Sequence, residues 1–193
     1  VPIFKLAEKF KEVIIDYAGR IVVAGRGDNL DGPLSSSDAL VLRLDQDGKL
    51  DMTFNAPIGW IGIDNGNYPQ VANSIAEDAN RRLVIVGQDY NGMSNDLALW
   101  RGTEAGQPDF TFGSNARIMW DNVVFGNDLG AAVFFDSSNN IIAAGSSYNG
   151  LSDDMLILRY VDICSVFSTP TPTITMTRTV TPTFTSTRTI TRT

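Results

Sequence analysis

The chain has 193 residues, of which 43% are hydrophobic and 19% are charged. A chain of this length can form one sizeable domain, and its many Gly, Asn, Asp and Ser residues indicate an all-β fold with numerous turns. The net charge of −7 argues against nucleic-acid binding. No run approaches the ~18 apolar residues of a transmembrane helix, so we expect no membrane insertion.

The first 15 residues contain two strand-like pieces, VPIFKL and EVII, although the stretch LAEKFKEVI is also compatible with a short helix. We interpret residues 1–15 as a candidate for strand exchange between copies. The sequence begins at Val1 without a signal-peptide pattern, so we expect a processed chain or a fragment.

A sequence pattern recurs three times along the body of the chain. Each copy has an aspartate, a short turn and an apolar strand that ends in glycine: DYAGRIVVAG at 16–25, DANRRLVIVG at 78–87 and DSSNNIIAAG at 136–145. A second strand follows in each copy, and its first residues are spaced by 58: Asp38, Asp96 and Asp154. The segment LDMTF at 50–54 returns as PDFTF at 108–112, again 58 residues later.

These residues resemble the delta-60 repeat, which combines an aspartate turn, an IVVAG-like strand, a D-x-L-x-R strand and a DGxLDxxF segment. The resemblance covers roughly residues 12–160 and is clearest in the first copy; the second lacks the DG turn, and the third stops after Arg159 and Tyr160. It implies propeller-like β blades in a secreted or surface-exposed bacterial protein. The family has no agreed catalytic residues, so the resemblance implies none here.

We expect a three-repeat β domain over residues 1–168, with repeats at roughly 12–72, 73–130 and 131–167, followed by an extended tail at 169–193. Each repeat supplies about four short strands and cannot cover its own apolar face. Propellers usually contain four to eight blades. Three repeats therefore either close as a three-fold, trefoil-like barrel or leave an open end for another copy or an exchanged strand. Contacts that fail to close build filaments.

Acidic residues give weak candidates for a metal site. Asp45, Asp47 and Asp51 alternate around a glycine turn and resemble a calcium loop, but a DG hairpin turn explains the same residues without metal. A second acidic group, in and beside the long first loop, has the same two interpretations: Asp28, Asp31 and Asp38. The chain has no histidine, no nucleophile motif and no phosphate-cradling motif, so we expect no catalytic residues, no cofactor and no enzymatic activity.

The three tryptophans are candidates for stacking on sugars. Trp100 occupies a strand position that leucine holds in the other copies, so we expect it in the core. Trp60 and Trp120 follow the LDMTF and PDFTF segments and are expected to be partly exposed. The single cysteine, Cys164, cannot form an internal disulfide and is interpreted as a buried, inert thiol.

The tail has threonine at every second position from 169 to 193. A period of two is that of an extended strand, which places the threonines on one face and the intervening residues on the other. Dense threonine with nearby proline is typical of O-glycosylation. The candidate glycosylation sites are Thr169, Thr171, Thr173, Thr175, Thr177, Thr179, Thr181, Thr183, Thr185, Thr187, Thr189, Thr191 and Thr193. The opposite face, which we expect to dock on protein, has the apolar residues Ile174, Met176, Val180, Phe184 and Ile190.

The tail also differs from the body in charge. It contains Arg178, Arg188 and Arg192, and removing these three leaves 12 basic and 22 acidic residues, a net charge of −10 for the rest of the chain. A basic ribbon can dock on an acidic neighbouring copy. A flexible spacer is the alternative interpretation, and an ice-binding surface fits poorly because such surfaces hold several threonine rows. No Asn-x-Ser/Thr sequon occurs, so a glycan would have to be O-linked.

The leading hypothesis is a structural subunit of an extracellular filament or surface assembly. It associates with itself head to tail, through the β-repeat body and the tail, and carries O-glycans on the tail threonines. The alternative is a carbohydrate- or protein-binding module of a bacterial surface adhesin, with the tail as a glycosylated stalk. The first hypothesis predicts assembly, whereas the second predicts a monomer.

Overall fold

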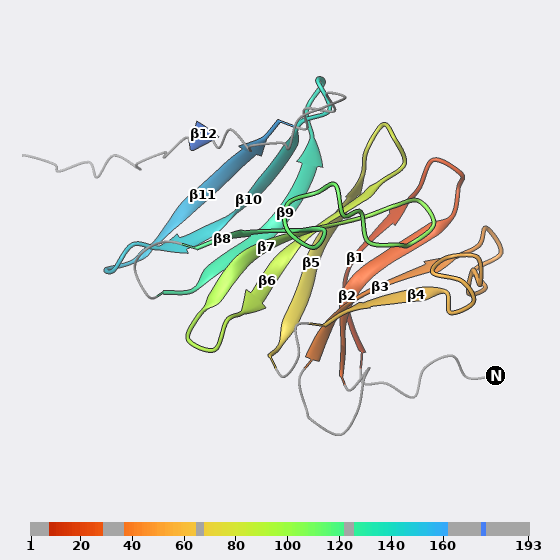
Figure 1. Ribbon diagram of the computed structural model, residues 1–193, viewed down its shortest axis with the longest axis horizontal. Helices are drawn as coiled ribbons and strands as arrows, with labels where there is room; N and C mark the ends of the chain where they lie inside the picture. Colours follow the sequence, from red (N-terminus) through yellow and green to blue (C-terminus); the bar gives the residue numbers. More distant parts are fainter. Residues whose placement is uncertain (1–7, 29–36, 65–67, 122–125, 162–174, 177–193) are drawn as a thin grey trace, which may run out of the picture.

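The computed structural model describes residues 8–28, 37–64, 68–121, 126–161 and 175–176. Within these residues the chain forms twelve β-strands in three four-stranded antiparallel sheets, and helices are absent. The described part of the chain accordingly has no helix long and apolar enough to cross a membrane. Figure 1 shows the sheets side by side in the order of the sequence. The expected all-β fold with propeller-like blades is confirmed.

Each sheet is one blade. Blade 1 contains β1 (Glu8–Ile15), β2 (Ile21–Asp28), β3 (Ser37–Leu44) and β4 (Trp60–Ile63). Blade 2 contains β5 (Gln70–Glu77), β6 (Leu83–Tyr90), β7 (Asn95–Gly102) and β8 (Arg117–Trp120). Blade 3 contains β9 (Asp128–Phe135), β10 (Ile141–Tyr148) and β11 (Asp153–Tyr160), and its fourth strand, β12 (Thr175–Met176), comes from the tail.

The recurring aspartate closes the hairpin between the first two strands of each blade. Asp16 Oδ1 accepts a hydrogen bond from the backbone N–H of Arg20 at 2.8 Å. Asp78 and Asp136 accept the same bond, from the residue four positions later, at 2.8 and 2.9 Å. An aspartate that satisfies turn amides in this way favours a tight reversal of the chain, so the sequence pattern fixes where each hairpin turns.

The glycine at the end of each IVVAG-like strand is required by a close backbone approach. A Cβ atom on Gly25, Gly87 or Gly145 would lie 2.3, 1.8 or 1.7 Å from a carbonyl oxygen of the blade's first strand. In all three blades this glycine lies beside a shift in register between the first two strands. Such shifts are β-bulges, which glycine accommodates.

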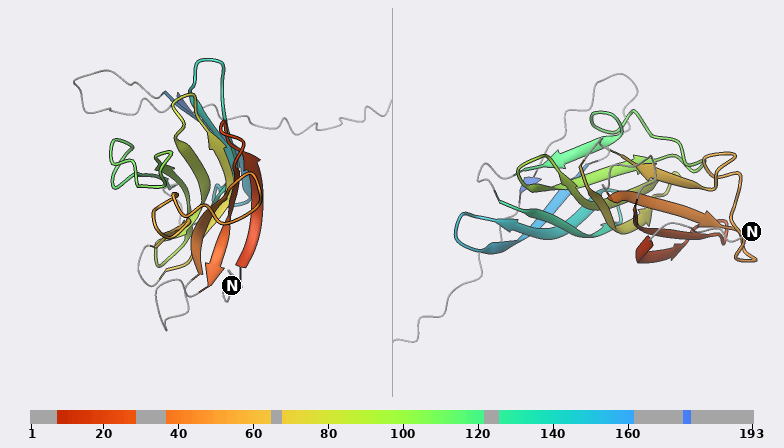
Figure 2. Two further views of the ribbon diagram at one scale, coloured as in Figure 1. Left: turned by 90° about the vertical axis from the view of Figure 1, so that its right-hand side faces the viewer. Right: turned by 90° about the horizontal axis from the view of Figure 1, so that it is seen from below.

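The hydrophobic core lies between the blades. One cluster packs Val22, Val41 and Phe54 of blade 1 against Ile85 and Trp100 of blade 2. A second cluster joins blades 2 and 3 and includes Val84, Val86, Leu97, Leu99, Phe112, Val133, Ile141, Ala143, Leu158 and Tyr160. Figure 2 shows the stacked sheets from two further directions. Most of the buried apolar side chains therefore lie where one blade covers another. Leu40 and Leu42 are also buried, although they lie on the face of blade 1 that points away from blade 2.

Two alternatives left open by the sequence are decided by the strand pairing. Residues 8–15 form β1, which pairs with β2, so the helix alternative for this segment is wrong. Every pairing between the described strands lies within one blade. The sheets therefore do not merge into a trefoil-like barrel. The blades also begin one strand before each aspartate turn, at residues 8, 70 and 128.

Candidate functional surfaces

The two faces of each blade make different contacts. In blades 1 and 2, we call the face that packs on the first strand of the following blade the leading face, and the opposite face the trailing face. In blade 3 the same names are given to the faces formed by the equivalent residues. On blade 1 the leading face consists of Val22, Ala24, Ala39 and Val41, all 0% exposed. On blade 2 the equivalent residues are Val84, Val86, Leu97 and Leu99, also 0% exposed. The second and third strands of an internal leading face are thus covered at these positions, while Ile14 and Ala76 of the first strands are partly buried.

The leading face of blade 3 has the same apolar character but is uncovered. Met155 and Ile157 of β11 are equivalent to Leu97 and Leu99 of β7, yet they are 65% and 36% exposed. Phe134 of β9 is 51% exposed on the same face. We define the blade-3 face as Ala132, Phe134, Ile142, Ala144, Met155 and Ile157. A contiguous exposed apolar surface of this kind marks an interaction site.

At the other end of the stack, the first strand of blade 1 exposes apolar side chains on the trailing face, whereas Leu40 and Leu42 of β3 on the same face are only 3% and 2% exposed. Phe10, Val13 and Ile15 of β1, which we define as the blade-1 face, are 52%, 59% and 65% exposed. Their counterparts in β5 that face blade 1 include Ala72 and Ile75, which are 0% and 2% exposed. Both ends of the three-blade stack therefore present uncovered apolar surface.

Hydrogen bonds from one blade to the next fix the spacing of the internal contacts. Glu12 Oε2 accepts from the backbone N–H of Ile75 at 2.7 Å, and its equivalent Ser74 Oγ accepts from Val133 N–H at 3.0 Å. Both acceptors stand on first strands, so the bond repeats once per blade. The corresponding position of blade 3 is Ala132. The blade-3 face therefore lacks this acceptor and is more purely apolar.

A buried ion pair recurs at the end of the third strand of blades 1 and 2. Arg101 Nε donates to Asp109 Oδ2 at 2.8 Å, with its guanidinium 4.4 Å from the centre of the Phe112 ring. Arg43 pairs with Asp51 at 2.7 Å in the same way. Burial alone would raise the pKa of Asp51 and of Asp109. Hydrogen bonds from the threonine two positions later and from the arginine outweigh burial and hold both pKa values below the usual one.

The equivalent arginine of blade 3 is in a different environment. Arg159 Nη2 donates to Asp136 Oδ2 at 2.6 Å, and the Arg159 side chain is 48% exposed, against 2% for Arg101. Hydrogen bonds from Asn140, and then from Arg159, hold the pKa of Asp136 well below its usual value. The same sequence position thus forms a buried pair with the LDMTF or PDFTF segment in blades 1 and 2, and an exposed pair with the hairpin aspartate in blade 3.

Three carboxylates meet at the contact between blades 2 and 3. Asp96, Asp121 and Asp128 each offer an oxygen within 4.8 Å of the others, and Asp96 and Asp128 are buried. Burial, and then the charges of Asp121 and Asp128, raise the pKa of Asp96 despite hydrogen bonds from Asn91 and Ser94. Clustered carboxylate oxygens are the ligands of hard cations such as Ca²⁺. Sequence reasoning missed this group because Asp121 and Asp128 come from either side of the connection between two blades.

The acidic residues singled out from the sequence lie elsewhere. Asp45 Oδ1 accepts from the backbone N–H groups of Asp47 and Lys49 at 3.0 and 2.9 Å, as expected for a tight turn. Asp51 is held by Arg43. The structure does not bring Asp45, Asp47 and Asp51 into a cluster of the kind formed by Asp96. Of the second candidate group, Asp28 ends β2, Asp38 is buried in β3, and Asp31 lies outside the described residues.

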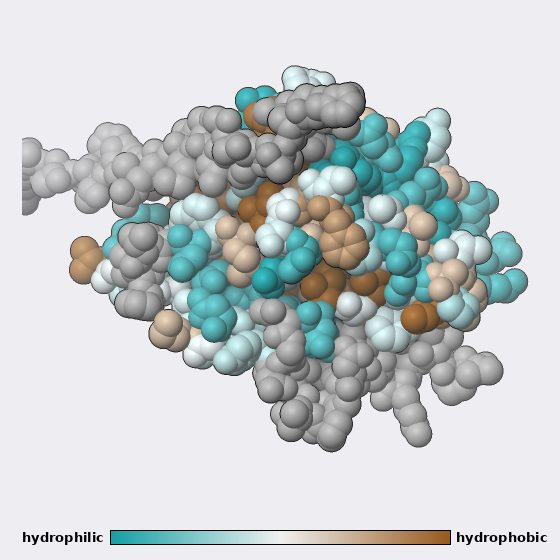
Figure 3. Space-filling model, viewed as in Figure 1, coloured by the Kyte–Doolittle hydropathy of each residue, from teal (hydrophilic) through white to brown (hydrophobic). Residues whose placement is uncertain are grey.

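The tryptophans occupy the positions expected for them. Trp100 is 5% exposed and belongs to the core between blades 1 and 2, whereas Trp60 and Trp120 are half-buried. On the face seen in Figure 3, brown apolar residues are visible in the middle of the molecule among teal hydrophilic ones. The three tryptophans belong to three different strands, Trp60 to β4, Trp100 to β7 and Trp120 to β8.

Most of the tail lies outside the described residues, including Cys164 just before it, the candidate docking residues Ile174, Val180, Phe184 and Ile190, and every candidate glycosylation threonine except Thr175. Thr175 and Met176 form β12, which pairs antiparallel with Arg159 and Leu158 of β11. This is the place that β4 and β8 occupy in the other blades. The beginning of the tail therefore takes a fourth-strand position.

A family model described as a domain of unknown function (DUF5122) beta-propeller matches residues 19–54. The matched stretch runs from the first aspartate turn through β2 and β3 to the buried Phe54 of blade 1. No curated protein matches the chain. The match supports a propeller-type β repeat, which agrees with the stacked blades of the structure.

Proposed function

We propose that the chain is a structural subunit of an extracellular filament or surface assembly, in which the blade-3 face of one copy packs on the blade-1 face of the next. The observation that carries the proposal is a difference in burial at equivalent positions. Leu97 and Leu99 are 0% exposed beneath the next blade, whereas Met155 and Ile157 are 65% and 36% exposed. A repeat face that is apolar at the end of a stack needs a further blade to cover it.

The residues that form the closest contact between two internal faces are replaced by residues of different size at the two ends of the stack. Inside the stack, Gly130 packs so closely on blade 2 that a Cβ would lie 2.5 Å from Val86 Cγ2 and 2.7 Å from the Gly87 carbonyl oxygen. On the blade-1 face, Phe10 replaces this glycine; on the blade-3 face, Ala144 replaces Val86. Ala144 removes part of this crowding, but the Gly145 carbonyl oxygen takes the place of the Gly87 oxygen, so the Phe10 ring requires a wider contact at this position than the one between blades 2 and 3.

The size of the contact indicates how strong it is. Complete burial of the six large side chains of the two faces other than Ile142 would contribute roughly 9–18 kcal/mol. They are 36–65% exposed, so roughly half of this remains to be gained. Association costs about 4–15 kcal/mol. A single contact between two copies is therefore weak. We expect the size of the assembly to increase with protein concentration, since each copy can use both of its end faces.

The proposal extends to the tail and to the location of the protein. We propose that the tail lies along the body of a neighbouring copy and displays O-glycans from its threonines toward solvent. The alternation of threonine with apolar residues supports this arrangement, since it separates a hydroxyl face from an apolar face. The pairing of β12 with β11 supports the ability of the tail to add a strand to a blade. Such a subunit acts outside the cell and has no catalytic task.

Sedimentation velocity over a range of concentrations tests the proposal with a matched pair of variants. Ile157→Asp places a charge on the blade-3 face, and Leu151→Asp places the same charge on a 92% exposed hairpin tip of the same blade. We expect Ile157→Asp to weaken association at least about tenfold, because it removes the burial of one isoleucine. Leu151→Asp should associate like the unchanged chain. Equal association of all three proteins would contradict the proposal, and a stable two-copy ring would contradict its filament part.

A second candidate function, a binding module of a surface adhesin, is favoured by one observation. Blades 1 and 2 enclose a cavity lined by apolar side chains and by the indole of Trp100. A cavity of this kind is a common place for a ligand. This function predicts a monomer at all concentrations, so the sedimentation experiment also distinguishes the two candidates.

A further inference from the structure

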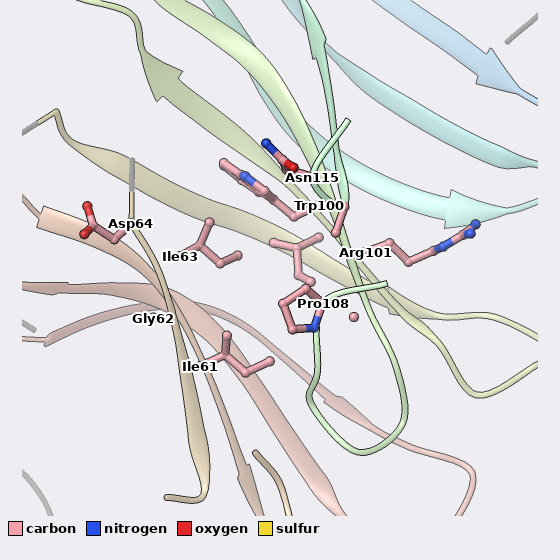
Figure 4. A pocket seen from close by; sticks show the side chains of 11 residues that line it. Ile61, Gly62, Ile63, Asp64, Trp100, Arg101, Pro108 and Asn115 are labelled. Atoms are coloured by element: carbon pink, nitrogen blue, oxygen red, sulfur yellow. The ribbon is translucent and has the colours of Figure 1, made fainter. Parts of the chain in front are cut away.

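A cavity of about 200 Å³ lies between the outer strands of blades 1 and 2. Ile61 and Ile63 of β4 line one side, and Ile85, Trp100 and Pro108 of blade 2 line the other. Figure 4 shows Ile61 and Ile63 opposite Trp100 and Pro108, with Asp64 at the end of β4 and Asn115 beside the indole. The walls are therefore mainly apolar, with a few polar groups near the rim.

The corresponding place between blades 2 and 3 carries larger side chains. Tyr160 is equivalent to Gly102, and Trp120 is equivalent to Ile63. Both of these large residues belong to the core between blades 2 and 3 or pack against it. Gly102 lines the cavity, and a Cβ on it would have its nearest neighbour at 3.6 Å. The space between blades 1 and 2 thus results from small residues at positions that the chain fills elsewhere.

One polar group in the cavity wall lacks a partner. Trp100 is 5% exposed, and its buried Nε1–H donates no hydrogen bond to any residue that the structure describes. A buried donor without an acceptor is unfavourable, and native proteins satisfy nearly all such groups. The cavity is therefore suited to an apolar group that brings an oxygen acceptor close to the indole.

We infer that this cavity binds the Phe184 side chain from the tail of a second copy, with a tail backbone carbonyl accepting from Trp100 Nε1. This inference rests on the proposed self-assembly. The tail offers an apolar side chain directly attached to an extended backbone, and Phe184 is its only aromatic residue. Successive side chains of a strand point to opposite faces, so Thr183 and Thr185 would point away from the cavity and remain free for glycans.

The surroundings of the cavity favour an extended, basic segment. β4 ends the strand order of blade 1, and its far edge pairs with no other strand in the described part of the chain. An edge of this kind accepts an added strand, as β11 accepts β12 of the tail. Asp64 lines the cavity beside β4, and the tail carries Arg188 four residues after Phe184. Opposite charges therefore favour this orientation of the partners.

The test uses the full-length chain at a concentration where it is monomeric, and a synthetic, unglycosylated peptide of residues 183–193. Binding is followed by the indole N–H resonance of Trp100 and by tryptophan fluorescence. Gly102→Tyr fills the cavity with the residue that blade 3 has at this position, and Gly102→Ala is its control because a single methyl group fits. We expect saturable binding, at least tenfold weaker to Gly102→Tyr and little changed for Gly102→Ala.

A second peptide keeps the test decisive if Gly102→Tyr does not fold. The peptide with Phe184→Ala should bind the unchanged chain at least tenfold more weakly, and the Trp100 N–H resonance should not shift. Equal binding of the two peptides, or equal binding to the two Gly102 variants, would overturn the inference. A shift of the same resonance by N-acetylglucosamine but not by the peptide would also overturn it. Because this test is made on monomers, its failure is distinct from loss of association through the blade-3 face.

Discussion

Replacement of Arg101 by methionine tests how much the buried ion pair at the end of the third strand contributes to the free energy of unfolding. Methionine keeps the length of the side chain but removes the charge. Arg101 is 2% exposed at its side chain and donates to Asp109 at 2.8 Å and to Thr111 at 3.1 Å. Asp109 is 10% exposed in the unchanged chain, and without Arg101 it keeps the more distant Arg82, at 3.9 Å. Breaking a buried pair from one side costs about 3–5 kcal/mol of unfolding free energy.

The matched control is Arg159→Met, at the equivalent position of blade 3. Its guanidinium also contacts an aspartate, at 2.6 Å, but the side chain is 48% exposed. Exposed ion pairs contribute little, because water and salt replace the partner. The two variants therefore make the same chemical change at the same repeat position, and they differ in burial and in the aspartate that the guanidinium contacts.

Urea unfolding followed by circular dichroism measures the effect. With a slope of about 1–3 kcal/mol per molar urea, Arg101→Met should lower the unfolding midpoint by at least about 1 M. Arg159→Met should lower it by a small fraction of that. Equal shifts for the two variants, or a shift for Arg101→Met no larger than the error of the midpoint, would refute the reasoning.

Three further predictions concern backbone contacts and carboxylate charges. Gly87→Ala should lower the unfolding free energy by about 1–3 kcal/mol or more, because its Cβ would lie 1.8 Å from a carbonyl oxygen; an unchanged melting temperature would contradict the bulge argument. Asp121→Asn should raise the melting temperature at pH 7. Burial, and in second place the charge of Asp121, raise the pKa of Asp96, so the charged form of Asp96 destabilises the folded state at this pH. The gain should shrink as the pH falls through the folded-state pKa of Asp96, and a gain independent of pH would exclude this cause. The pKa of Asp109 is lowered, so the charged form of this carboxylate stabilises the folded state. This stabilisation is complete above the ordinary pKa of aspartate and is lost as the pH falls through the lower folded-state pKa. Arg101→Met should therefore reduce the loss of melting temperature on acidification.

The blade pattern was predictable because its determinants are local in sequence. Asp16 and its repeats make hairpin turns through side-chain oxygens, and Gly25 and its repeats permit a close backbone approach. Both requirements recur with each blade and therefore appear in the sequence as a repeat. The first strand of each blade was harder to place, since residues 8–15 combine strand-like and helix-like patterns and only pairing with β2 decides between them.

The surfaces between blades were not predictable in the same way. The cluster of Asp96, Asp121 and Asp128 combines the third strand of one blade with the residues on either side of the connection to the next. Trp100 was expected in the core, and it is buried there. The cavity beside it depends on Gly102, whose significance emerges only when blades 1 and 2 are stacked. Sequence spacing therefore indicates the blades, whereas their stacking determines which positions are covered.

The most direct test of the central claim, that the blade-3 face of one copy packs on the blade-1 face of the next, is disulfide formation between two cysteine variants. Ser74 Oγ lies 3.0 Å from Val133 N inside the stack, and the equivalent residues across the contact between copies are Ala132 and Val13. Each variant carries one cysteine, Ala132→Cys or Val13→Cys, in a chain with Cys164→Ser. A disulfide needs Cα atoms about 4.4–6.8 Å apart.

Mass spectrometry of an oxidised equimolar mixture gives the result. We predict a cross-linked product that joins residue 132 of one copy to residue 13 of another, at a yield far above that obtained when Leu151→Cys replaces Ala132→Cys. Leu151 is the suitable control because it is 92% exposed and lies on the same blade away from the face. A yield equal to that of the control, or no product, would contradict the contact between the two end faces.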